Sequence, residues 1–416
     1  MSLIKSRTLK VLLLVLFLTS FYSPAQAAEC STTSNSYTGN GTNGVSNTNY
    51  VVLAVTQIGS CTWTVPSGVT AADVLVVGGG GGGAGGLFSY SDGAGGGGGG
   101  GAYRADAYPL TPGNSISIVV GAGGKGGDTV TVANRDQSRG LRGNASSFGV
   151  ISGGGGGGAG YITSGDSQTG MSGTAGGGGG GSTEFWNAYN NGGACVSTYY
   201  AAGGAGVTAT IGAKTYTGVA GGVGGIYCAS GTNGASGGGR ADATSSSTGA
   251  PGAGLTDLIT GTSVEYGRGG IAKGATGWSN GLAALGIGYG GNGSIDSLTG
   301  TSGGNGIVYI RMISAKVNSF ALTGNATTAI YRTPIGITVN TAVASKVSFS
   351  ANGKRIPNCL NIATTGTSPN ITATCNWSPN VIGRFSLSAS VSPISGGLGV
   401  AAGPISVTIS RRTNKR

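Results

Sequence analysis

The chain has 416 residues, of which 90 are glycine, 8% are charged and none is histidine. Without histidine it can form neither a Ser-His-Asp nor a Cys-His catalytic group, and no metal site can use an imidazole ligand. The 11 prolines exclude a collagen triple helix, which needs abundant proline and glycine at every third position. Because 38% of the residues are hydrophobic, charge-driven disorder is disfavoured, and the length allows two or three domains.

Residues 1–27 are predicted to be a secretory signal peptide. They begin with basic residues, continue with the apolar segment Val11–Leu18, and end in the small-residue cleavage motif Ala25-Gln26-Ala27. The apolar segment is too short to span a bilayer, which takes roughly 20 residues. We therefore expect a secreted or surface-associated protein without a transmembrane span.

All six cysteines follow the predicted cleavage site, and an even number in an oxidising compartment indicates disulfides. Six cysteines allow 15 pairings. Sequential pairing is favoured because each pair then lies within one compositional region. The spacings are unlike those of zinc sites, so no metal is predicted. The favoured pairs are Cys30–Cys61, Cys195–Cys228 and Cys359–Cys375.

Five segments before residue 313 have the β-branched and aromatic composition of strands. The fourth follows the turn signal Pro112-Gly113, and the third leads directly into a run of glycines. The predicted strands are Tyr50–Gln57, Cys61–Val65, Asp73–Val77, Ser115–Val120 and Gly306–Arg311.

Glycine forms four uninterrupted runs of six or seven residues, at 78–83, 95–101, 153–158 and 176–181. They could be flexible linkers, although linkers favour variable lengths and polar flanks. They could instead be polyglycine-II helices, with three residues per turn and backbone groups that point outward to neighbouring helices. Ordering costs about 1–2 kcal/mol per residue and a hydrogen bond returns about 0.5–1.5, so only a bundle braced by strands and disulfides would be stable. Because apolar strands adjoin the runs, we predict packed polyglycine-II helices on a β framework.

Beyond residue 313 the sequence is rich in Val, Ile, Thr and Ser and predicts a β-sandwich. Asn352-Gly353 is a strong hairpin signal, and the loop after it would be closed by Cys359 and Cys375. Trp377 is expected in the core rather than in a binding site. The predicted strands are Ile335–Thr341, Lys346–Ala351, Ile371–Trp377, Arg384–Val391 and Ile405–Ser410.

Charge divides at the same place as composition. Residues 28–312 contain ten basic and all twelve acidic residues, a balance of −2, whereas residues 313–416 contain ten basic and no acidic residue, a balance of +10. The basic half, with its tail at 411–416, is expected to attract an anionic envelope polymer. Nucleic acid is not an expected partner, because no recognised binding module is present and the protein is predicted to be exported.

Six segments of the glycine-rich region form a recognisable set in a fixed order. They are Cys61–Val69, Asp73–Val77 with its glycine run, Leu110–Gly113, Val119–Gly124, Ser146–Gly149 and Gly303–Arg311. Together they resemble a glycine-rich domain found in bacterial secreted proteins and phage tail-fibre adhesins. The resemblance covers about residues 50–312 and implies a β framework that holds packed polyglycine helices, with variable loops at their tips. In tail adhesins such loops bind a cell-surface receptor.

The C-terminal region is similar to the Ig-like domains of bacterial surface proteins. Ala351–Pro357, Cys359, Cys375-Asn376-Trp377 and the basic end look like modules of secreted actinobacterial proteins. The cysteine and tryptophan order differs from that of antibody domains. The expected organisation is a signal peptide (1–27), a glycine-rich domain (28–312), an Ig-like β-sandwich (313–410) and a basic tail (411–416).

Motifs of enzymes occur but lack their partners. Gly-x-Ser-x-Gly patterns centre on Ser236, Ser279 and Ser302, yet a nucleophile elbow needs histidine. Lys125 is followed by glycine, so the phosphate-loop pattern fails. Residues 123–131 fit one copy of the calcium nonapeptide, whose sites form between stacked repeats; a turn between strands is therefore preferred. The acids are too scattered to indicate a glycosidase. We predict no enzymatic activity and no cofactor.

The best candidate for ligand binding is the aromatic and amide-rich stretch from residue 184 to 200. Aromatic faces and amide groups suit a cell-surface glycan or protein receptor. The same side chains could instead cap the glycine bundle, and a structural coat or matrix role without a specific ligand is the alternative function. Tyr266, Trp278 and Tyr289 form a weaker second group. The candidate ligand-binding residues are Trp186, Tyr189, Asn190, Tyr199 and Tyr200.

Overall fold

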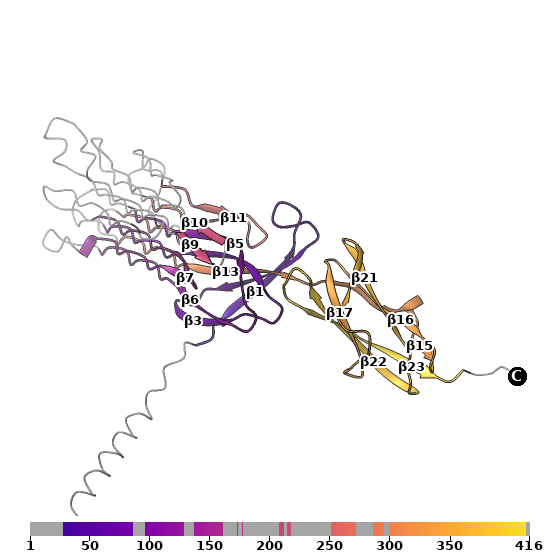
Figure 1. The fold of residues 1–416 in the computed structure, drawn as a ribbon. Helices are drawn as coiled ribbons and strands as arrows, with labels where there is room; N and C mark the ends of the chain where they lie inside the picture. Colours follow the sequence, from indigo (N-terminus) through magenta and orange to yellow (C-terminus); the bar gives the residue numbers. More distant parts are fainter. Residues whose placement is uncertain are drawn as a thin grey trace, which may run out of the picture.

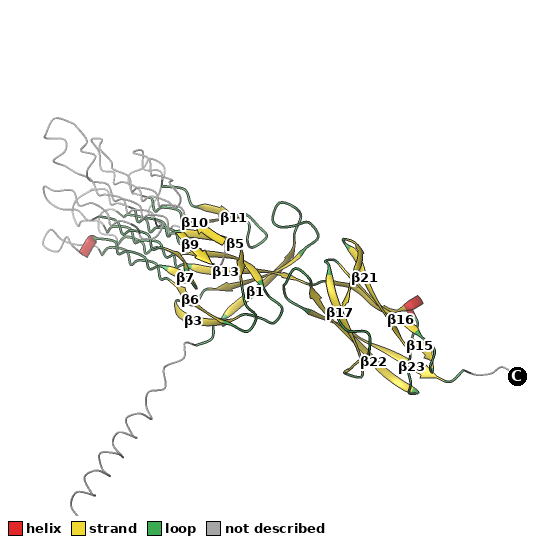
Figure 2. Ribbon diagram, in the orientation of Figure 1, coloured by secondary structure: helices red, strands yellow, loops and turns green. Residues whose placement is uncertain are grey.

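The structure, a computed structural model, is nearly all β, with several antiparallel sheets, which confirms the predicted mainly-β class (Figures 1 and 2). The predicted signal peptide, the stretch from 184 to 200 and the Cys195–Cys228 pair lie outside the described residues. The described residues are 28–85, 96–128, 137–160, 173, 177, 208–211, 214–217, 251–271, 286–294 and 299–412.

The N-terminal half is built on a five-stranded antiparallel sheet in the order β1-β2-β13-β4-β5. Its last strand in sequence lies in the centre, so the chain returns to this sheet after crossing the whole glycine-rich region. β4 is buried along most of its length, as expected for a strand of valine, leucine and alanine. The strands are β1 (Thr32–Thr38), β2 (Asn49–Val55), β4 (Ala71–Val77), β5 (Ala102–Pro109) and β13 (Ile307–Ser314).

A second sheet, in the order β3-β6-β7-β8, packs against the first around a shared apolar core. Phe148 lies at its centre, with ring centroids 5.2 Å from Tyr108 and 6.0 Å from Trp63. The predicted Cys30–Cys61 disulfide is confirmed and ties the N-terminal segment to β3. The strands are β3 (Gly59–Thr64), β6 (Ser115–Val120), β7 (Ser146–Phe148) and β8 (Ile151–Gly153).

Two short hairpins complete the strands of this half among the described residues. The second hairpin carries Tyr266, which packs with Tyr309 of β13 at a ring-centroid distance of 6.0 Å. The hairpin strands are β9 (Thr208–Ile211) with β10 (Lys214–Thr217), and β11 (Leu255–Asp257) with β12 (Val264–Tyr266).

Glycine-rich segments extend from this framework as parallel rods (Figure 1). The central rod, residues 78–85, continues directly from β4. Its N–H groups reach three neighbouring segments, and each neighbour is met by every third residue, the period of a polyglycine-II helix. The pairs, with N···O distances of 2.8–3.0 Å, are Gly78–Gly101 and Gly81–Gly98; Gly79–Asn144, Gly82–Leu141 and Gly85–Ser138; and Gly80–Gly304 and Gly83–Thr301.

The carbonyl groups of the central rod accept hydrogen bonds from three further segments. These are residues 121–128, 153–160 and 286–294. Within the described residues, the six neighbours are also bonded to one another in a closed ring. Its order is 96–101, 153–160, 138–144, 121–128, 299–306 and 286–294, then back to 96–101. The predicted packed polyglycine helices are therefore present for three of the four glycine runs, within a bundle of one rod enclosed by six. Of the fourth run, 176–181, only Gly177 is among the described residues.

Glycine is required in the central rod because neighbouring backbones lie where a side chain would begin. A Cβ atom at Gly82 would overlap the carbonyl oxygen of Lys125, and one at Gly80 would overlap that of Tyr289. Backbone contact at this distance lets the N–H and C=O groups satisfy each other without water. The hydrogen bonds thus offset part of the conformational entropy that glycine loses on ordering.

The C-terminal half consists of two sheets around a separate apolar core that includes Trp377. One has the order β14-β16-β21-β20, and the other β15-β23-β22-β17-β18, with β19 also paired to β17. The bounds are β14 (Val317–Leu322), β15 (Thr328–Ile330), β16 (Ile335–Thr341), β17 (Ser345–Ala351), β18 (Lys354–Arg355), β19 (Ile362–Ala363), β20 (Thr365–Thr367), β21 (Asn370–Trp377), β22 (Gly383–Pro393) and β23 (Val400–Ser410), with a 3-10 turn, η3 (Thr323–Asn325), after β14.

The turn and the disulfide that were predicted for this half are confirmed. Asn352 and Gly353 form a two-residue turn between β17 and β18, with φ values of 48° and 73°, as a type I′ hairpin requires. The predicted Cys359–Cys375 disulfide is also formed. Among the described residues, no helix is long and apolar enough to cross a membrane.

The two halves are in direct contact. Leu398, between β22 and β23, packs against the N-terminal core and donates its N–H to the carbonyl of Ile313 at 2.8 Å. In return, Ala315 donates to the carbonyl of Leu398 at 3.0 Å, and the N–H of Gly397 reaches the carbonyl of Gly68 at 2.9 Å. These contacts place the loop before β23 beside the cleft described below.

Candidate functional site

The rod bundle has one end at the sheets and one end away from them. Gly78 pairs with Gly101 and Gly81 with Gly98, so residues 78–85 run outward from β4 and residues 96–101 run back to β5. The chain likewise reaches the outer end at Asp128 and at Gly160. The described rods that contain Gly85, Asp128 and Gly160 therefore reach the outer end of the bundle. The stretch with Trp186, Tyr189, Asn190, Tyr199 and Tyr200 lies outside the described residues.

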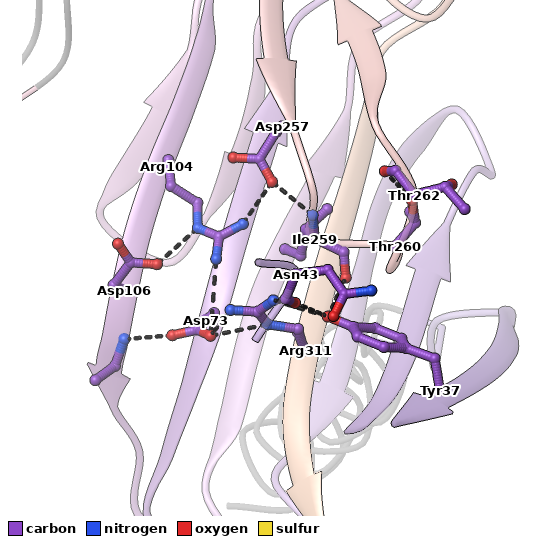
Figure 3. Close-up of polar contacts among 11 residues, drawn as sticks. Tyr37, Asn43, Asp73, Arg104, Asp106, Asp257, Ile259, Thr260, Thr262 and Arg311 are labelled. Carbon is purple, nitrogen blue, oxygen red and sulfur yellow. Dashed lines mark hydrogen bonds and ion pairs between the residues drawn. The ribbon is translucent and has the colours of Figure 1, made fainter. Parts of the chain in front are cut away.

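A cleft of about 830 Å³ lies at the opposite, inner end of the N-terminal half. Its walls come from the β1–β2 loop, strands β4, β5 and β13, the β11–β12 hairpin, and Ser395 and Gly396 of the C-terminal half. Three carboxylates and two guanidinium groups line it, a formal balance of −1 (Figure 3). These charged residues are Asp73, Asp106, Asp257, Arg104 and Arg311.

Arg104, on β5, links three strands through its guanidinium group (Figure 3). Its Nε donates to Asp106 at 2.8 Å and its Nη1 to Asp257 of β11 at 2.7 Å, while Nη2 lies 3.7 Å from Asp73. The same oxygen of Asp257 accepts the N–H of Ile259 at 2.7 Å. Arg104 therefore fastens the β11–β12 hairpin to the edge of the five-stranded sheet.

Asp73, on β4, lies where the pairing of β4 with β5 shifts register. Its Oδ1 accepts the N–H of Ala107, a residue with a positive φ of 47°. Its Oδ2 accepts from Nε of Arg311, directly opposite on β13, at 2.9 Å. One carboxylate thus satisfies a backbone donor freed by the bulge and neutralises a nearly buried arginine.

Arg311 also holds the β1–β2 loop in place. Its Nη1 donates to the hydroxyl of Tyr37 at 2.8 Å and to the carbonyl of Asn43 at 2.9 Å, and the guanidinium lies 4.8 Å from the ring centroid of Tyr50. Tyr37 in turn donates to the Asn43 carbonyl at 2.8 Å. The amide of Asn43 reaches the carbonyl of Gly261 at 2.7 Å, so this loop is also fixed to the β11–β12 hairpin.

Burial and charge shift the ionisation of these groups. Burial alone would lower the pKa of Arg311, but the hydrogen bond and charge of Asp73, helped by Tyr37, outweigh it and raise that pKa. Burial raises the pKa of Tyr37, against the opposing influence of Arg311. Both groups therefore keep their protons, with Arg311 charged and Tyr37 neutral, over the physiological range.

The arrangement suits a structural junction better than catalysis. Every carboxylate of the cleft is already bonded to a guanidinium group. Among the described residues, no three Cys, Asp or Glu side chains gather as a metal site would require. In the calcium-like segment, the carboxylate of Asp128 is paired with the ammonium of Lys125 at 2.9 Å.

The structure changes the interpretation of the second aromatic group, which comprises Tyr266, Trp278 and Tyr289. Tyr266 is fully buried because its ring packs among apolar side chains beside β13, so its prediction as part of a second ligand-binding group is wrong. Tyr289 is half-buried, with its hydroxyl donating to Glu265 at 3.1 Å. Trp278 lies outside the described residues. These tyrosines support the base of the rods instead of forming a binding face.

The cleft and four of the seven rods in the described part of the chain were not predicted from the sequence. The rods had a usable signal, since residues 121–128 carry their non-glycine residues at every third position, Ala122, Lys125 and Asp128. Lys125 is exposed, and Ala122 and Asp128 are partly exposed. Of the glycines in this segment, Gly123 is partly exposed and the others are buried. A two-glycine repeat with one variable residue therefore marks a rod that has two faces inside a bundle and one outside. The cleft has no such repeat, because its charged residues are dispersed between Asp73 and Arg311.

A β framework that holds a bundle of hydrogen-bonded glycine rods defines a glycine-rich structural domain. The chain matches the glycine-rich domain family over residues 55–313, and it belongs to that family. The match starts at the end of β2 and ends within β13, so it contains every described rod. A search of curated proteins found no match to this chain.

Proposed function

We propose that this is a secreted, non-enzymatic surface protein that binds a cell-surface partner through segments attached to the outer end of the rod bundle. The observation that carries the proposal is the enclosure of the central rod by six others, which makes the bundle a rigid support. The rod that precedes the longest stretch between described rods also ends at the outer end, at Gly160. Rigid support reduces the entropy lost when attached segments bind a ligand.

Secretion is supported by the signal-like sequence at 1–27 and by the Cys30–Cys61 and Cys359–Cys375 disulfides, since such bonds persist in oxidising compartments. The ligand proposed is a glycan or protein receptor, held by the aromatic and amide side chains at 184–200. The acid-free C-terminal half supports an anionic envelope component as a second, attachment partner.

A glycan array and a whole-cell binding assay test the proposal. Trp186→Ala with Tyr189→Ala should abolish binding while leaving the melting temperature unchanged. Tyr161→Ala with Tyr227→Ala, which replaces two aromatic residues before and after residues 184–200, is the matched control and should bind normally. Unchanged binding by the first variant would refute the proposal. Absence of any ligand together with self-assembly at micromolar concentration would favour the coat or matrix role instead.

A further inference from the structure

Three segments meet at the end of the C-terminal sandwich opposite the rods, and we call them the C-terminal tip: residues 330–333, 378–382 and 410–412. Figure 1 shows β15 and β23 running towards this end, where the described residues end at Arg412. Ile330 is paired with Ser410, and the N–H of Tyr331 donates to the Ser410 carbonyl at 2.9 Å. The N–H of Arg332 donates to the carbonyl of Pro379 at 2.8 Å, which joins residues 330–333 to residues 378–382.

The C-terminal tip carries exposed aliphatic side chains. Val381 is 56% exposed, Ile382 is 43% exposed and Ile330 is 39% exposed. Gly383 pairs with Ile409 of β23, so Ile382 comes beside Ser410 on one side while Ile330 lies on the other. Since single exposed aliphatic residues are ordinary but grouped ones mark interaction surfaces, this grouping calls for a partner.

The surroundings of these aliphatic side chains are cationic. Arg332, Arg384, Arg411 and Arg412 are all exposed and lie within or next to the C-terminal tip. The guanidinium of Arg332 stacks on the Tyr331 ring, 5.1 Å from its centroid. The sequence contains no acidic residue after 312, so no carboxylate of this half balances these charges.

The base of the C-terminal tip is rigid. Trp377 and Phe385 pack edge to face beneath it, with ring centroids 5.4 Å apart, and Tyr331 and Ile335 pack on the same core. Aliphatic side chains held outward on a firm base and surrounded by arginines have the chemistry of a surface that meets both acyl chains and anionic head groups.

We propose that the C-terminal tip binds the surface of an anionic lipid bilayer, with Val381, Ile382 and Ile330 entering the interface and the arginines contacting head-group phosphates. A soluble anionic polymer would use the arginines but would gain nothing from the aliphatic side chains, which is why lipid is the better fit. This attachment is independent of the ligand proposed for the rods. It would leave the outer end of the rod bundle facing away from the membrane (Figure 1).

Vesicle co-sedimentation of residues 28–416 tests the proposal. Vesicles containing phosphatidylglycerol should bind the protein, and vesicles of phosphatidylcholine alone should bind it at least about tenfold more weakly. Val381→Ser with Ile382→Ser should reduce binding about fivefold or more, because these side chains would no longer enter the interface. Arg411→Gln with Arg412→Gln should reduce it on the order of tenfold, since each cation near an anionic surface contributes.

Matched controls separate the C-terminal tip from general properties of the chain. Ile58→Ser with Ile394→Ser removes two aliphatic residues that are each 51% exposed but lie elsewhere, and should bind normally. Lys316→Gln with Lys346→Gln removes two exposed charges remote from the tip and should have a much smaller effect than the arginine variant. An unchanged melting temperature shows that each variant is folded.

Two outcomes would overturn the proposal. One is full vesicle binding by the Val381→Ser, Ile382→Ser variant, which would mean that the attraction is electrostatic alone. The other is binding to soluble poly(glycerol phosphate) without binding to vesicles, which would assign the basic half to an envelope polymer. Loss of vesicle binding in both tip variants, with normal binding by the aliphatic control, supports the proposal.

Discussion

Asp73 and Arg311 face each other across β4 and β13, with Asp73 Oδ2 2.9 Å from Arg311 Nε. The pair joins two ends of the glycine-rich region, since 238 residues separate them in the chain. Around it, Arg104 and Tyr37 bring in the β11–β12 hairpin and the β1–β2 loop. The pair thus closes the framework from which the rods extend.

Asp73→Ala should lower the free energy of unfolding by about 3 kcal/mol, because the nearly buried Arg311 guanidinium would lose its carboxylate and the Ala107 N–H its acceptor. Urea denaturation measures the change. Asp106→Ala is the control: its carboxylate is 68% exposed, and its loss should cost less than about 1 kcal/mol. Equal effects of the two substitutions would contradict the role given to Asp73.

Gly82→Ala should destabilise the rod bundle by about 3 kcal/mol, since the added Cβ would push apart the central rod and residues 121–128 and break hydrogen bonds between them. Lys125→Ala, at an exposed position on the neighbouring rod, should change stability by less than about 1 kcal/mol. Thermal unfolding and amide exchange of the glycine N–H groups measure both. Rapid exchange of those groups in the unmodified protein would show that the rods are not hydrogen-bonded in solution.

Stability should fall in alkaline solution because burial raises the pKa of Tyr266 and of Tyr309 above the usual 10.0. Above pH 10.0 these tyrosines ionise in the unfolded chain but keep their protons in the folded one. The unfolded state then binds fewer protons, so the free energy of unfolding decreases as pH rises from 10.0 towards the folded-state values. At pH values well below 10.0 both tyrosines keep their protons in the folded and the unfolded chain, so their full contribution to the free energy of unfolding is present.

Tyr266→Phe tests this alkaline effect. It keeps the buried ring and removes the titrating hydroxyl, so the decrease of the unfolding free energy above pH 10.0 should be shallower than in the unmodified protein. Denaturation at a series of alkaline pH values gives the slope. An unaltered slope would mean that other groups cause the alkaline loss.

Replacing Cys359 and Cys375 together by alanine should lower the free energy of unfolding by about 3 kcal/mol, because the bond closes a loop of 16 residues in the unfolded chain. The loss should be confined to the C-terminal half, which has its own core. Calorimetry of the unmodified and double-alanine proteins should show one transition shifted. A shift of the N-terminal transition by the same amount would indicate that the two halves unfold as one unit.

Much of the strand pattern could be read from local composition. Ser115–Val120 and Ile335–Thr341 have the predicted bounds, and the Asn352-Gly353 turn forms as its residues require. β5 was not predicted, since its sequence mixes alanine with charged and aromatic residues and becomes a strand by pairing with β4. β1 is polar and almost wholly exposed, so it gives no hydrophobic alternation to recognise.

The sequence by itself determined the mainly-β class, the presence of stiff glycine rods, two of the disulfides and the unbalanced positive charge after residue 312. Each of these depends on local composition or on simple counts. Only the tertiary structure decided that six rods enclose residues 78–85, that Arg311 meets Asp73 and Tyr37, and that Ile330 and Ile382 share one end of the sandwich. Such contacts join residues tens to hundreds of positions apart, and the chain path and sheet order that bring them together are properties of the whole fold.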